Sequence, residues 1–97
     1  MSDKSEMTLT EAQQIIRDPS KSIHAHLFAA AVIYQSPDST LEDLLVCTKH
    51  QHRSIAWQGA NMLHLRTGRP QRHDENGWLI IEKDGWEDYF ENENKTT

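Results

Sequence analysis

The chain has 97 residues, which is enough for one domain with one modest hydrophobic core. Its apolar fraction is 36%, or about 40% with its four glycines, against roughly 45–50% for an average globular chain. A net charge of −5 argues against general nucleic-acid binding, and a single cysteine, Cys47, excludes an internal disulfide.

The sequence predicts a soluble cytoplasmic protein. The N-terminal residues contain no apolar signal segment, and the longest apolar run, 27–34, is too short to span a bilayer. A lone cysteine also fits a reducing compartment. We therefore expect no association with a membrane.

A first helix is expected from Thr8, because Thr8-x-x-Glu11 has the form of a capping box. Its apolar face carries Leu9, Ala12, Ile15 and Ile16. The pair Asp18-Pro19 ends this helix, since proline disfavours helical backbone in the residue before it.

A second helix is expected to start near Ser20–Ser22 and to run to about Gln35, followed by a turn at 36–39. Apolar side chains cover most of its circumference, at Ile23, Leu27, Phe28, Ala30, Ala31 and Tyr34. A helix that is apolar on so many sides is expected to be sandwiched between neighbours.

The pattern then restarts, and Ser39-x-x-Glu42 and Thr40-x-x-Asp43 both have the form of a capping box. One helix follows, and residues 49–52 break it. A helix over 53–67 comes next, and Gly68 is placed as its left-handed C-terminal cap. The two units superimpose without a gap at an offset of 32 residues, which is typical of helical repeats.

The caps, the Asp18-Pro19 turn and the small-residue-rich second helices resemble HEAT-like repeats. The ending Leu63–Gly68, followed by the aromatic and acidic stretch Gly85–Phe90, is similar to the C-terminal end of some small HEAT-like proteins. The resemblance implies a mainly α fold, a short α-solenoid of two HEAT-like helical hairpins with a C-terminal extended segment and a short capping helix. Its expected parts are a single domain at 8–91, with units at 8–38 and 40–70 and a cap at 77–91, and disordered ends at 1–7 and 92–97.

The last third of the chain reverses the charge pattern. Residues 44–73 contain no acidic residue, whereas 74–93 contain eight and only one cation, Lys83. This acidic tail can fold back onto the basic stretch or stay solvated. An extended segment is expected at Trp78–Ile81, and a short helix from Gly85 to about Asn92.

Six histidines raise the question of a metal site. His50, His52 and His64 are the candidate ligands, but no pair has the spacing of a zinc motif. His24 and His26 are expected to diverge, because helical residues two apart do not face one another. We expect no metal and no other cofactor, and we expect Cys47 to be a buried core thiol rather than a nucleophile.

The function favoured by the sequence is non-enzymatic binding of another protein through a face of the solenoid. The predicted contacts are Arg53, Trp57, Arg66 and Arg69, because tryptophan and arginine dominate binding hot spots. Trp57 has a competing interpretation, in which it packs beneath the C-terminal segment. A homodimer through an open end is also expected, whereas nucleic acid is not an expected partner.

Two other functions stay open at this point. One is an immunity or inhibitor protein whose acidic face, carrying Glu87, Asp88 and Glu91, blocks a basic toxin or nuclease. The other is metal-dependent chemistry around the three candidate histidines.

Overall fold

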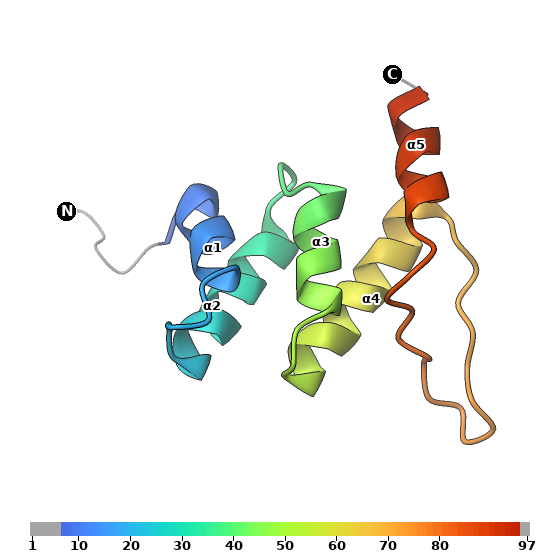
Figure 1. The fold of residues 1–97 in the computed structure, drawn as a ribbon, viewed down its shortest axis with the longest axis horizontal. Coiled ribbons are helices and arrows are strands. Elements are labelled where there is room, and N and C mark those ends of the chain that lie inside the picture. The colour runs from blue at the N-terminus through green and yellow to red at the C-terminus, as the bar shows by residue number, and fades with distance from the viewer. Residues whose placement is uncertain (1–6, 96–97) are drawn as a thin grey trace.

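The structure, a computed structural model, describes residues 7–95 of the chain. It is mainly helical, as predicted, and its helices are α1 (Leu9–Ile16), α2 (Ile23–Gln35), α3 (Leu41–Thr48), α4 (Arg53–Thr67) and α5 (Glu87–Lys95) (Figure 1). Of the ends expected to be disordered, 1–6 and 96–97 lie outside the described residues, whereas 92–95 belong to α5. Met7, which we assigned to the first of them, packs against the core.

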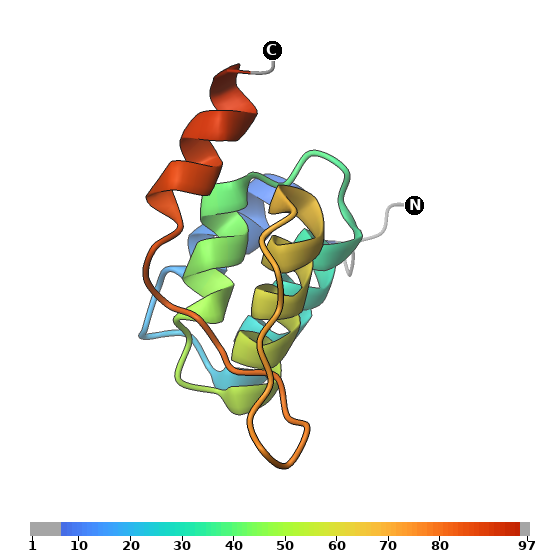
Figure 2. The same ribbon diagram turned by 90° about the vertical axis from the view of Figure 1, so that its right-hand side faces the viewer.

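The helices α1 to α4 form two layers. α1 packs against α2 and α3 packs against α4, so that each pair is a helical hairpin. Figure 2 shows α1 and α3 on one side and α2 and α4 on the other. The core between the layers and at the α4 end comprises Ala12, Ile16, Ala29, Ala30, Ile33, Leu44, Cys47, Ile55, Leu63 and Trp86.

The two hairpins begin in the same way. At α1 the Thr8 hydroxyl accepts a hydrogen bond from the Glu11 N–H, and the Glu11 carboxylate accepts one from the Thr8 N–H. Thr40 and Asp43 repeat both bonds at α3. The capping boxes predicted at Thr8 and Thr40 are confirmed, whereas the alternative at Ser39 is not, because the Ser39 hydroxyl donates to the Ser36 carbonyl. α1 and α3 start 32 residues apart. At the other end of the second hairpin, Gly68 closes α4 with a left-handed φ of 80°.

A glycine allows α3 and α4 to approach closely. A Cβ atom at Gly59 would lie 2.8 Å from the Cys47 Cβ and 2.8 Å from the Thr48 backbone nitrogen. Real Cβ atoms essentially never come so near to backbone atoms, so only glycine fits between these helices without a shift.

The C-terminal third packs against the α4 side of the helices (Figure 1). Its expected extended segment forms an irregular hairpin with one antiparallel bridge, between His73 and Leu79. α5 then begins at Glu87 rather than at Gly85, and it continues past position 91 to Lys95. Trp86, just before α5, is only 1% exposed and belongs to the core.

The prediction that α2 is sandwiched between neighbours is wrong on its outer side. Ile23, Leu27 and Phe28 are 43%, 37% and 50% exposed. The positions that face the core are His26, Ala29, Ala30 and Ile33. With only two layers in the described fold, the outer side of the α2–α4 layer is uncovered, although the α2 sequence is apolar there.

We predict that Gly59→Ala lowers the free energy of unfolding by about 1–3 kcal/mol, because the new methyl group forces α3 and α4 apart. The better helix propensity of alanine opposes this by about 1 kcal/mol. Urea unfolding measures the difference, and Gln58→Ala, at the exposed neighbouring position, is the control. Equal stability of Gly59→Ala and the native chain would contradict the close approach.

Candidate functional site

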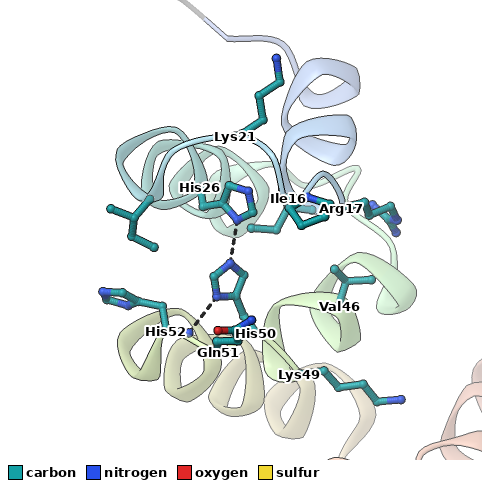
Figure 3. Close-up of a pocket in the computed structure, with 11 residues that line it drawn as sticks. Ile16, Arg17, Lys21, His26, Val46, Lys49, His50, Gln51 and His52 are labelled. Atoms are coloured by element: carbon teal, nitrogen blue, oxygen red, sulfur yellow. Dashed lines mark hydrogen bonds between the residues drawn. The ribbon is translucent and has the colours of Figure 1, made fainter.

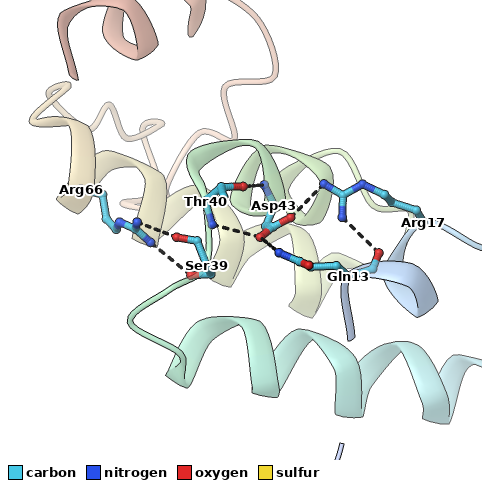
Figure 4. A network of polar contacts seen from close by, with 6 residues as sticks. All are labelled: Gln13, Arg17, Ser39, Thr40, Asp43 and Arg66. Atoms are coloured by element: carbon cyan, nitrogen blue, oxygen red, sulfur yellow. Dashed lines mark hydrogen bonds and ion pairs between the residues drawn. The ribbon is translucent and has the colours of Figure 1, made fainter. Parts of the chain in front are cut away.

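A buried carboxylate joins the two hairpins in the α1–α3 layer. Asp43 is 2% exposed, and besides capping α3 it accepts hydrogen bonds from Gln13 Nε2 at 2.8 Å and from Arg17 Nη2 at 2.9 Å (Figure 4). Arg17 also donates to the backbone carbonyl of Gln13. The contact fixes where α1 lies along α3.

The charge of Asp43 is stabilised by these donors. Burial alone would raise the pKa of the carboxyl group, but hydrogen bonds from the Thr40 N–H, Gln13 and Arg17 outweigh burial and lower the pKa below its usual value. Asp43 therefore stays ionised, and its stabilising contribution is lost only as the pH falls through this lowered pKa.

Two histidines join the hairpins at the opposite end of α3. His26 of α2 and His50 of the α3–α4 turn lie with Nδ1 and Nε2 2.7 Å apart (Figure 3). The His52 N–H donates to His50 Nδ1 at 2.9 Å, so the proton of a neutral His50 ring sits on Nε2 and is donated to His26. His26 Nε2 then donates to the Asp18 carbonyl at 2.8 Å. This directional chain is called the histidine relay below.

The relay uses both ring nitrogens of both histidines. Neither ring can take up a proton or bind a metal without breaking a hydrogen bond. The prediction that His24 and His26 diverge concerned this helix alone and did not include His50. Stacked hairpins place their turns side by side, and that adjacency is the signal that could have suggested the contact.

The three candidate metal ligands are not brought together. His64 donates from Nδ1 to the Arg69 carbonyl at 2.9 Å and packs edge-on against Trp86. His50 belongs to the relay, and the buried Nδ1 atom of His52 has no hydrogen-bond partner. In residues 7–95 no three or more His, Cys, Asp or Glu side chains form a group that could hold a metal ion.

Two of the four predicted contact residues bind within the chain. Arg66 donates from Nη2 to the Ser39 carbonyl at 2.7 Å, linking α4 to the α2–α3 loop (Figure 4). Arg69 donates to the Asp84 carbonyl, lies 3.4 Å from the Glu82 carboxylate, and has its guanidinium 4.4 Å from the Trp86 ring centroid. Arg72 also pairs with Glu82, at 2.6 Å. Part of the acidic tail thus does fold back onto the basic stretch.

The other two predicted contacts are exposed. Arg53 and Trp57 are one helical turn apart on α4, so their side chains are neighbours. Trp57 is 41% exposed, which makes the interpretation that it is covered by the C-terminal segment wrong. Together with Leu27 and Phe28 of α2 and Leu65 of α4, Trp57 forms what we call the apolar face.

A separate groove of about 730 Å³ lies between the two hairpin turns (Figure 3). We call it the basic groove, because three cations and three histidines contribute to it and no carboxylate does. Its lining consists of Ile16, Arg17, Pro19, Lys21, Ile23, His26, Val46, Lys49, His50, Gln51 and His52.

Cys47 is a free thiol and is fully buried, which confirms its predicted place in the core. Burial raises the pKa of the Cys47 thiol to about 11. The group is therefore protonated at neutral pH, and its sulfur lies out of reach of solvent.

The chain matches no family model, and neither a curated protein nor a solved structure is significantly similar to it. Over residues 7–95, no helix combines the length and the apolar character needed to cross a membrane.

We predict that Asp43→Asn lowers the free energy of unfolding by about 2–3 kcal/mol, because it leaves Arg17 without its counter-ion. The loss stays below that of a fully buried pair, since the Arg17 side chain is 39% exposed and water can solvate it. Glu11→Gln is the matched control, because Glu11 has the same capping role at an exposed helix start and should cost about 0.5–1 kcal/mol. Urea unfolding gives both values, and equal losses would mean that the contact between hairpins contributes nothing measurable.

We also predict that His50→Gln weakens the pH dependence of stability. Burial, with the neighbouring His26 and His52 rings, lowers the pKa of His50 below its usual value. The unfolded chain therefore takes up this proton first, so stability is full above about pH 6.5 and falls as the pH drops below it. Glutamine can accept from the His52 N–H and donate to His26 without titrating.

Urea midpoints for this comparison are measured from about pH 7.5 to pH 5. His24→Gln, at an exposed position of α2, is the control and should keep the native pH dependence. A His50→Gln protein with an unchanged pH dependence would show that the relay does not titrate with folding.

Proposed function

We propose that this chain is a non-enzymatic protein-binding module, built as a short HEAT-like α-solenoid of two units. Two hairpins that start with the same capping box 32 residues apart, and that share a two-layer arrangement, support the solenoid assignment. The free, buried Cys47 is in keeping with a cytoplasmic location.

The observation that carries the binding function is the apolar face. Phe28 is 50% exposed, Trp57 41% and Leu65 72%, and they belong to adjacent helices of one layer. Several large apolar side chains exposed on one layer are candidates for an interaction site. α2 has no charged residue and α4 has only Arg53 and Arg66, so a partner would desolvate few charges there.

Contact with Trp57 would contribute most to the free energy of binding a partner. Its indole offers a large area at low entropic cost, and Arg53 beside it can pair with an acidic group at the rim of the interface. Of the predicted contacts, Arg66 and Arg69 are already engaged within the chain, so the proposal depends on Arg53 and Trp57.

An acidic inhibitor is the second candidate, and α5 favours it. This helix extends beyond α1–α4 (Figure 1), and Glu87, Asp88 and Glu91 on it are exposed. Such a helix could cover the basic active site of a toxin or nuclease.

We predict that Trp57→Ala abolishes capture of the partner in a pulldown with partner identification, or weakens it by at least about tenfold. Phe28→Ala should weaken it as well. Trp78→Ala is the matched control, because Trp78 is 62% exposed and belongs to the C-terminal hairpin rather than to α2 or α4.

Retained capture by Trp57→Ala and Phe28→Ala would reject the apolar face as the interface. The inhibitor would be favoured if the partner were no longer captured after Glu87, Asp88 and Glu91 were changed to lysine, while Trp57→Ala still captured it. Sedimentation of the native chain and Trp57→Ala shows whether the partner is a second copy of the chain.

A further inference from the structure

The basic groove is a second surface, separate from the apolar face. It is formed by the α1–α2 turn on one side and the α3–α4 turn on the other, and the histidine relay connects the two sides (Figure 3). Its walls therefore come from both hairpins, and the relay holds them at a fixed spacing.

The groove carries two lysines without an ion pair. Arg17 is paired with Asp43, but among the side chains of residues 7–91 neither Lys21 nor Lys49 forms an ion pair. Asp18 in the α1–α2 turn attracts Lys21 and accepts two hydrogen bonds from Ser20 through Oδ1, but it does not line the groove. Figure 3 shows Lys21 and Lys49 on opposite sides of the groove, each with its ammonium group directed outward to solvent.

The helix that starts at the groove adds to this charge. The N-cap residues of α1, α2 and α3 accept hydrogen bonds through their side chains, whereas His52 at α4 makes no such bond. The first N–H groups of α4 thus keep their hydrogen-bonding capacity and the positive end of the helix dipole. The unpartnered Nδ1 atom of His52 is buried at the same place.

The other residues that line the groove indicate which class of anionic ligand fits it. Ile16, Ile23 and Val46 make part of the wall apolar, which suits a peptide side chain. No Phe, Tyr or Trp lines the groove to stack on a nucleobase.

We propose that the basic groove binds an acidic peptide segment of a partner protein. Carboxylates of the segment would pair with Lys21 and Lys49, and an apolar side chain between them would contact Ile16 and Val46. This inference goes beyond the proposed function, because it uses other residues and does not require the apolar face.

The test uses a fluorescein-labelled peptide of alternating glutamate and leucine, titrated with the full chain and followed by fluorescence anisotropy. At about pH 7.5, where ordinary histidines are neutral, and at low salt, we expect saturable binding that weakens as salt is added. The same peptide with glutamine for glutamate should bind at least about tenfold more weakly.

Charge reversal locates the site. Lys21→Glu and Lys49→Glu together should abolish binding. Each alone should also weaken it more than Lys83→Glu, which makes the same single charge reversal at an exposed position outside the groove and should lower affinity by less than about twofold. Trp57→Ala should leave peptide affinity unchanged, so a failure of the proposed function and a failure of this inference are distinguishable.

Three results would overturn the inference. They are no saturable binding of the acidic peptide, equal losses from the groove and Lys83 variants, and tighter binding of a single-stranded oligothymidylate than of the peptide. The last result would assign the groove to nucleic acid.

Discussion

The arrangement of the hairpins depends on a single buried carboxylate. Asp43 starts α3 and, with its remaining lone pairs, holds Gln13 and Arg17 of α1. Because a carboxylate that gave up these donors would be buried without partners, α1 has one favourable position along α3. That position aligns the hairpin turns, and the distance between His26 and His50 and the walls of the basic groove follow from it.

The cationic residues of the chain fall into two groups: some bind other parts of the chain, and others face solvent. Arg66 and Arg69 each bind another segment of the chain through two guanidinium nitrogens, as a planar guanidinium can. Arg17 bonds Asp43 of α3 with one nitrogen and the Gln13 carbonyl of its own helix with another. Lys21 and Lys49, whose ammonium groups are more strongly hydrated, stay at the surface. Part of the positive charge of 44–73 is therefore used in contacts within the chain, and only the rest is available to a partner.

Local features could be predicted from the sequence, and features that depend on packing could not. The capping boxes at Thr8 and Thr40, the end of α4 at Gly68 and the burial of Cys47 follow from short-range rules and were correct. The contacts Arg17–Asp43 and His26–His50 need the hairpins to be stacked first. For the same reason the sandwiching of α2 was wrong, since an apolar circumference does not reveal how many layers surround a helix.

The close approach at Gly59 also bears on how the molecule opens. α3 and α4 are in near backbone contact, and Trp86 packs into the core beside them. The first hairpin contacts them less extensively, through shared core side chains, hydrogen bonds and one ion pair. We expect native-state hydrogen exchange to divide the chain into two cooperative units. The amides of α1 and α2 would exchange through a partial opening that leaves the second hairpin and the packing of Trp86 intact, which makes 41–90 the more persistent part of the fold.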